Sequence, residues 1–208
     1  MAADAEGTDP GRGPSPAAVR RRQGRVEEKR LTVLRATLDL IEEGVLDPTI
    51  QQIEERSGVP ERSIFRYFDK EELALGALAL AAEEFHATRG VPQTRGGPLE
   101  RRIVHLVEHR IRSLSSMANL GRASRIRAVD SPELDRQIVG NTHQLRDDYA
   151  LFFEPELARL GDDERYELLD VITALLTFEG YDVLRRRLGR TDDEIASTWG
   201  TALHQLLS

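Results

Sequence analysis

Residues 57–68 read SGVPERSIFRYF, and this stretch decides the fold that the sequence predicts. Gly58 suits the end of a helix, because a residue without Cβ adopts the left-handed backbone conformation at little cost. Pro60 suits the first turn of the helix that follows. Thr49 and Gln52 form a predicted capping box at the start of the helix that Gly58 ends. The sequence therefore predicts two short helices joined by a tight turn.

The second of these helices has an apolar face and a basic face. Ile64 and Phe68 lie one turn apart and are expected to point into a core. Arg62 and Arg66, also one turn apart, then point away from that core. Guanidinium groups suit phosphates and guanine edges in a major groove. Arg62 and Arg66 can therefore meet phosphates or a guanine edge.

Almost every other segment has the apolar periodicity of a helix, and no stretch of useful length alternates as a β-strand does. A longer helix ahead of the short pair is marked by Val33, Leu34, Leu38 and Ile41. The three helices together have the size of a helix-turn-helix unit. Further helix starts are predicted at Asp69, Pro98, Ser131, Asp162 and Thr191. The predicted fold class is therefore all-α.

The composition excludes several classes of protein. The chain has 208 residues, a net charge of −7 and no cysteine, so it has no disulfides or thiolate metal ligands, which indicates the cytoplasm. Its most apolar run, residues 73–82, has about half the length that a membrane span needs. No Gly-rich phosphate loop or nucleophile elbow is recognisable. We therefore expect no membrane segment, no cofactor and no enzymatic activity.

Charge is distributed unevenly along the chain. Residues 12–35 carry eight basic side chains against two acidic ones, whereas residues 71–208 carry 23 acidic and 17 basic ones. We expect residues 1–24 to form a disordered basic arm, because their Ala, Gly and Pro content cannot bury a core. The arginines that can reach DNA from here are Arg20, Arg21, Arg22 and, just after this segment, Arg25. The alternative for this basic stretch is a solubilising tail. The basic end of the chain is thus the predicted DNA-facing part.

The C-terminal part is predicted to hold two long, apolar-striped helices. One lies between Gly161 and Gly189, and the other begins at Thr191, with Trp199 on its apolar stripe. A single copy would leave apolar surface uncovered, and pairing with a second copy gives a four-helix bundle. We therefore expect a homodimer, which also lets a short recognition helix read two half-sites.

Residues 30–73 resemble the tetracycline-repressor (TetR) family of transcriptional regulators. The matching residues are Thr49, Ile53, Gly58, Val59, Ser63, Phe65, Tyr67, Phe68, Lys70, Glu71 and Leu73. The resemblance implies a tri-helical helix-turn-helix domain over 25–72 and a helical ligand-binding and dimerisation domain over 73–208. It also implies a double-stranded DNA operator, usually palindromic, as partner.

The resemblance implies a role for single residues as well. Thr49 and Lys70 would present helix N-termini to phosphates, and Tyr67 would donate its hydroxyl to the DNA backbone. The major groove would be faced by Arg62, Ser63 and Arg66. Phe65 stands where the family usually has tyrosine, so it would make only apolar contact with DNA. Glu54 stands where the family prefers alanine, and we expect it to tilt outward or to pair with Arg62 or Arg66.

An effector cavity is expected among the middle helices. Candidate contacts with an unknown small molecule are His105, His109, Tyr149, Phe152, Phe178 and Tyr181. Most aromatic residues at helical spacing are simply part of a core, which is the alternative for each of the aromatic candidates. The segment from His105 to His109 also reads H-x-x-E-H, a pattern of zinc hydrolases. No third ligand is identifiable nearby, so we expect no metal there.

The sequence thus predicts a homodimeric, cytoplasmic DNA-binding regulator that acts as a repressor and is released by a small molecule. A regulator without an effector and an activator are alternatives within this class. Outside it, the alternatives are a helical protein-interaction adaptor without DNA binding and the zinc hydrolase. The adaptor depends on Glu54, because a pairing with an arginine would remove that arginine from DNA.

Overall fold

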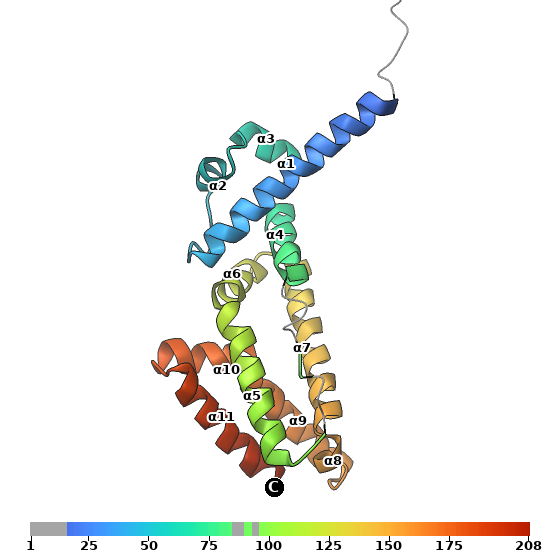
Figure 1. Ribbon diagram of the computed structural model, residues 1–208, viewed down its shortest axis with the longest axis vertical. Coiled ribbons are helices and arrows are strands. Elements are labelled where there is room, and N and C mark those ends of the chain that lie inside the picture. Colours follow the sequence, from blue (N-terminus) through green and yellow to red (C-terminus); the bar gives the residue numbers. More distant parts are fainter. Residues whose placement is uncertain (1–15, 85–89, 93–95) are drawn as a thin grey trace, which may run out of the picture.

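The computed structural model describes residues 16–84, 90–92 and 96–208 (Figure 1). Helices are the only regular secondary structure in these ranges, which confirms the predicted all-α class. No helix in the described part of the chain is both long and apolar enough to cross a membrane.

The N-terminal part contains α1 (Pro16–Glu42), α2 (Ile50–Ser57), α3 (Glu61–Tyr67) and α4 (Lys70–Glu84). In Figure 1, α2 and α3 lie on one side of the long α1, and α4 leads away from it toward the remaining helices. Their shared core is formed by Val33, Leu40, Ile53, Val59, Ile64, Tyr67, Phe68 and Leu73. Burial of Ile64 and Phe68 confirms the inner face predicted for α3.

The predicted turn between α2 and α3 is present. Thr49 caps α2, with the Gln52 amide donating to Thr49 Oγ1 at 3.3 Å and the Thr49 amide donating to Gln52 Oε1 at 2.8 Å. Gly58 follows α2 with φ of 67°, in the left-handed region that favours glycine. Asp69 and Glu72 form a similar reciprocal cap at the start of α4. Local capping therefore sets the lengths of these helices.

Two expected boundaries differ from the limits of the helices. The arm expected to be disordered over 1–24 is helical from Pro16 onward, and residues 1–15 lie outside the described part. Proline is tolerated in the first turn of a helix, and the alanines, arginines and glutamine that follow are good helix formers. The division expected at residues 72 and 73 falls inside α4, whose Leu73 packs in the N-terminal core.

The remaining helices form the rest of the molecule, and the longer ones among them lie roughly along its long axis (Figure 1). They are α5 (Leu99–Ser116), α6 (Ala118–Ala128), α7 (Pro132–Phe152), α8 (Glu154–Leu157), α9 (Asp162–Leu176), α10 (Phe178–Asp182), the π-helical turn η2 (Val183–Arg187) and α11 (Asp192–Leu207). The predicted caps at Ser131 and at Thr191 with Glu194 are confirmed. These helices enclose a second core, which is centred on α5 and α11.

The long helix predicted between Gly161 and Gly189 is interrupted at Thr177. This residue has extended backbone with ψ of 172°, and its hydroxyl accepts from the Gly180 amide at 3.4 Å while donating to the Ala174 carbonyl at 2.9 Å. Threonine competes for backbone groups in this way, so it favours a cap over a helix interior. Thr177 therefore ends α9 and starts α10.

The apolar stripe of α11 is covered within the same chain. Ile195, Trp199 and Leu203 are fully buried, and their helix packs chiefly against α5. The expectation that a second copy is needed to cover this stripe is therefore wrong. Apolar side chains that do remain exposed in this region are Val171, Val183, Leu188 and Leu206.

Helix α6 joins the N-terminal helices to the rest of the chain. Asn119 Nδ2 donates to the Glu42 carbonyl at the end of α1 at 2.9 Å. Arg127, at the other end of α6, forms an ion pair with Asp47 in the segment between α1 and α2. Leu120 and Ala123 pack between these two contacts against Leu38 and Ile41 of α1, which lie in the same small core. The two parts are thus connected by packing as well as by polar contacts.

Replacing Gly180 by alanine is expected to lower the free energy of unfolding by about 1–3 kcal/mol. A Cβ at this position would overlap the Leu175 carbonyl oxygen, and a backbone atom has little freedom to move away. Gly140→Ala is the matched control, because a Cβ in that exposed interior position of α7 meets nothing within 4 Å. It is expected to stabilise by about 0.5–1 kcal/mol. Urea unfolding followed by circular dichroism measures both, and equal effects would contradict the break at Thr177.

Candidate nucleic-acid interface and effector cavity

Helix α3 displays its basic face to solvent. Arg62 and Arg66 are exposed, Ser63 is half-buried, and Phe65 stands between them with 61% of its surface exposed. In the described part of the chain, Arg62 has no ion pair or side-chain hydrogen bond. The helix therefore exposes an aromatic side chain and two arginines, residue types suited to contact with a partner through charge and stacking.

Tyr67 differs from the other candidates because its ring is buried in the N-terminal core. Its hydroxyl accepts a hydrogen bond from Arg66 Nη2 at 2.9 Å, and the Arg66 guanidinium lies 4.9 Å from the centre of the Tyr67 ring. The hydroxyl still has its own proton to donate. Tyr67 therefore orients Arg66 on the surface of α3.

The C-terminal end of α3 is held by an arginine that sequence reasoning missed. Arg30 of α1 donates through Nη1 to the Tyr67 carbonyl, and its guanidinium lies 4.2 Å from the centre of the Phe68 ring. A cation suits this position, because the end of a helix carries partial negative charge. Arg30 had no distinguishing signal in the sequence, where it is one of several arginines in a basic run.

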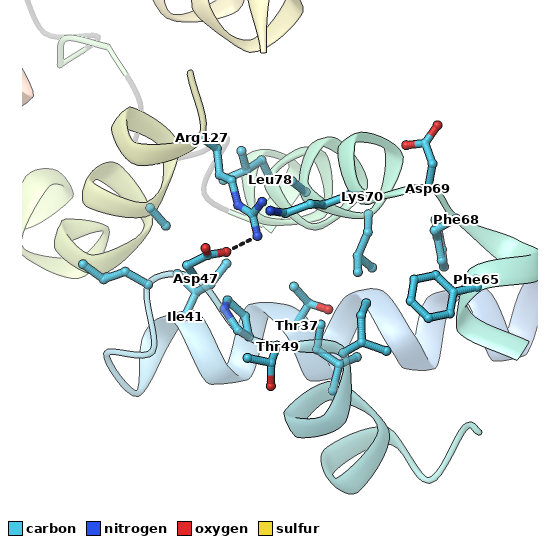
Figure 2. A pocket seen from close by; sticks show the side chains of 17 residues that line it. Thr37, Ile41, Asp47, Thr49, Phe65, Phe68, Asp69, Lys70, Leu78 and Arg127 are labelled. Carbon is cyan, nitrogen blue, oxygen red and sulfur yellow. Dashed lines mark hydrogen bonds and ion pairs between the residues drawn. The ribbon is translucent and has the colours of Figure 1, made fainter. Parts of the chain in front are cut away.

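Thr49, Phe65 and Lys70 line a cavity of about 350 Å³ between α1, α2, α3, α4 and α6. Its floor is apolar, and the Asp47–Arg127 ion pair lies at one side. Figure 2 shows Lys70 extending from α4 toward this ion pair. Thr49 is exposed, with its hydroxyl engaged in the α2 capping box. Both helix starts that the resemblance assigns to phosphates therefore border one hollow.

Glu54 leaves the arginines of α3 free. The residue is half-buried on α2, and in the described part of the chain no ion pair or side-chain hydrogen bond joins it to Arg62 or Arg66. The arginine that does pair with a carboxylate on this side is Arg56, which bonds Glu43 through both guanidinium nitrogens at 3.0 and 2.6 Å. This contact lowers the pKa of Glu43. Of the two alternatives expected for Glu54, the structure therefore gives no support to pairing with a DNA-facing arginine in the described residues.

A second cavity, of about 360 Å³, lies among α5, α6, α7 and α10. Its apolar lining includes Leu114, Met117, Ile138, Leu145 and Phe178. The polar groups that reach it include Arg110, Ser113, Arg125 and Asp148. Its size lies within the roughly 300–1,000 Å³ range of small-molecule sites. Its lining also includes the uncharged polar residues Asn141, Thr142, Gln144 and Thr177, so part of its wall is polar.

Most of the predicted effector contacts do not line this cavity. Phe178 does, and the Arg125 guanidinium lies 4.9 Å from the centre of its ring. Tyr149, Phe152 and Tyr181 are instead fully buried in the core. Aromatic periodicity marks a helix face, but it does not distinguish a packed core from a cavity wall.

The two histidines of the H-x-x-E-H segment lie on α5 outside the second cavity. His105 is exposed and His109 is half-buried. In the described part of the chain, no three histidine, aspartate or glutamate side chains are grouped so that they could hold a metal ion. The segment therefore gives no structural support to the zinc alternative.

Tyr149 is expected to make unfolding sensitive to alkaline pH. Burial raises the pKa of its hydroxyl to about 12, against 10.0 in an exposed tyrosine, and the neighbouring Arg110 charge opposes the rise. Because the folded state holds this proton more tightly, the contribution is present below pH 10 and is lost between pH 10 and 12. Two pKa units correspond to roughly 3 kcal/mol.

Urea unfolding at pH 8, 10 and 11 measures this loss in the wild-type chain and in Tyr149→Phe. The variant is expected to lose less stability over that range, because phenylalanine does not ionise. Tyr166→Phe removes an exposed tyrosine and is expected to behave as the wild type does. Equal pH dependence in all three proteins would contradict the buried neutral hydroxyl.

Comparison with known proteins adds no relative. No family model, no curated protein and no solved structure matches this chain. The case for a function therefore depends on the residues and geometry above.

Proposed function

We propose that the chain is a TetR-like, homodimeric DNA-binding transcriptional regulator, a repressor that a small molecule releases from a palindromic operator. The observation that carries the proposal is the division of α3. Ile64, Tyr67 and Phe68 hold the helix in the core, while Arg62 and Arg66 face solvent. A short helix fixed by its apolar face and presenting arginines is suited to enter a major groove.

The N-terminal end of α1 supports DNA binding electrostatically. Arg20, Arg21, Arg22 and Arg25 are all exposed on this helix, which extends past α3 in Figure 1. Their charges are opposed locally by only Glu27 and Glu28. Such a positive segment attracts phosphates and makes binding depend on salt. The net charge of −7 does not oppose this, because the acidic excess lies beyond α3.

A homodimer remains part of the proposal on functional grounds. A seven-residue α3 reads few base pairs, and a two-fold pair reads two half-sites. Val171 of α9 and Leu206 of α11 are exposed apolar side chains on the two helices that we expect to pair. Analytical ultracentrifugation of the full chain measures the mass, and a monomer at micromolar concentration would contradict this part.

The second cavity supports an effector-responsive regulator over one without an effector. Its lining includes Arg125 of α6, and the same helix carries Arg127, which pairs with Asp47 near the start of α2. If α6 has two positions, a ligand that binds one of them more tightly increases the population of that position, because only a difference in affinity shifts an equilibrium. The N-terminal helices, which contact α6, would then move with it. An activator would use the same cavity and helices, but its binding to DNA would increase transcription.

An electrophoretic mobility-shift assay tests the proposal. The probe is the DNA upstream of the chain's own coding sequence, at low salt, with unrelated DNA of equal length as competitor. Retention of the upstream fragment, lost steeply as salt rises, is the expected result. Absence of a shift with intact protein would overturn the regulator and favour the protein-interaction adaptor.

A further inference from the structure

The second cavity contains a buried positive charge with no carboxylate partner. Arg110 of α5 is only 6% exposed, and its Nη2 donates to the Leu176 carbonyl at 2.9 Å. In the described part of the chain it forms no ion pair, and its Nε has no hydrogen-bond partner. Burying a charge is costly unless the charge is paired and hydrogen-bonded. The guanidinium is therefore incompletely satisfied by the protein itself.

Arg102, two turns earlier on the same helix, shows how this fold pairs a buried arginine. It is 4% exposed, and its two terminal nitrogens bond the two oxygens of Glu156 at 2.9 and 3.1 Å. Its Nε is also unpartnered, so the difference between the two arginines is the carboxylate. Arg110 has a cavity of about 360 Å³ where Arg102 has Glu156. The carboxylate that pairs with Arg110 could therefore come from a bound ligand rather than from the protein.

We propose that this cavity binds a small organic acid, whose carboxylate pairs with Arg110 and whose apolar body contacts the apolar part of the lining. The apolar body would lie against Leu114, Met117, Ile138, Leu145 and Phe178. A carboxylate matches the planar guanidinium with two parallel hydrogen bonds. The inference rests on the proposed function only for the regulatory role of the acid, and binding itself can be measured without DNA.

The other charged groups of the cavity limit where the acid group lies. Arg125 is paired with Glu179 at 2.7 Å, so its charge is already compensated. Asp148 is half-buried on α7, and Gln144 Nε2 donates to its carboxylate at 3.4 Å. Its negative charge disfavours an anion on its own side of the cavity. The acid group is therefore placed at Arg110, and Asp148 is expected to weaken its binding.

Calorimetric titration of the full chain, in a buffer without small carboxylates or phosphate, tests the proposal. The probes are octanoate, 4-phenylbutyrate and naphthalene-1-acetate, each compared with its uncharged primary amide. At least one acid is expected to bind ten or more times as tightly as its amide. Arg110→Met is expected to weaken that acid roughly 10- to 100-fold, the value of a charge-assisted contact, and to change its amide little.

Matched variants separate loss of the charge from loss of the fold. Arg110→Lys keeps the charge without the planar fork, so the preference for acid over amide is expected to persist at lower affinity. Asp148→Asn removes the opposing charge and is expected to raise acid affinity severalfold. Arg136→Met removes an exposed arginine of α7 and is expected to change nothing. Arg110→Met is also expected to melt no lower than the wild type, because it removes an uncompensated charge.

The outcomes are distinguishable. Failure of every acid to bind, equal binding of acid and amide, or acid binding unchanged in Arg110→Met would each overturn the anion site. Acid binding that requires Arg110 and also releases DNA supports both the site and its regulatory role. Failure of the acid-free protein to bind DNA would count against the proposed function alone, because the Arg110 comparison does not involve DNA.

Discussion

Arg102→Met is expected to lower the free energy of unfolding by about 3–5 kcal/mol. The substitution leaves Glu156, which is only 8% exposed, as a buried carboxylate without its partner. It also removes the donor to the Phe152 carbonyl and the cation that lies 5.3 Å from the centre of the Phe152 ring. These contacts tie α5 to α7 and α8, so the loss is expected to affect the whole second core. Urea unfolding at pH 7 measures it.

The double variant Arg102→Met with Glu156→Met is the control for this prediction. Replacing both members of a buried ion pair by apolar residues is often neutral or stabilising, so the double variant is expected to recover most of the loss. A single variant less than 1 kcal/mol below the wild type would show that the pair contributes little. A double variant as unstable as the single one would show that packing, not the unpaired carboxylate, is responsible.

Arg66→Ala is expected to weaken binding to the retained DNA fragment roughly 10- to 100-fold, the range for one specific arginine contact. The side chain is exposed and is oriented by the Tyr67 hydroxyl at 2.9 Å, so its removal should leave the fold intact. Arg62→Ala is expected to act in the same direction. Fluorescence anisotropy with labelled DNA at several salt concentrations measures the affinity and its salt dependence.

The salt dependence distinguishes a base contact from a phosphate contact at Arg66. Loss of a phosphate contact weakens binding to all DNA sequences alike and lowers the slope of log affinity against log salt concentration by about one. Loss of a base contact weakens binding mainly to the specific fragment. Arg136→Ala changes the net charge equally but lies on α7, so it is expected to retain the affinity of the wild type. Equal losses in Arg66→Ala and Arg136→Ala would contradict a DNA-facing role for α3.

Features that depend on neighbouring residues were predictable from the sequence. The caps at Thr49 and Thr191 and the turn at Gly58 involve groups within three residues of one another, so their patterns carry the information. The break at Thr177 had only part of this signal. Its hydroxyl also bonds within three residues, to the Gly180 amide, but a glycine stands where Thr49 and Thr191 have a glutamine or a glutamate, so no capping box marked the break. The close approach of Gly180 to the Leu175 carbonyl depends on how the chain packs.

The candidate sites were predicted unequally for the same reason. The division of α3 into Ile64 inside and Arg66 outside follows from helical periodicity alone. Burial of Tyr149 and Phe152 in the core depends on which helices meet, which periodicity does not specify. Arg110 was missed although a signal was present. It occupies a position of the stripe formed by Leu106, Val107, Ile111 and Leu114, where a charged residue is unusual.

The Asp47–Arg127 ion pair between α6 and the α1–α2 segment has a consequence for measurements at different ionic strengths. Asp47 is exposed, so dissolved ions screen this pair more than a buried one. Rising salt would therefore loosen the protein's own junction while it also displaces the protein from DNA. The salt dependence of DNA affinity measured on the wild type therefore includes both effects. In Asp47→Asn the ion pair is absent, so the salt dependence of this variant reports the DNA contacts alone.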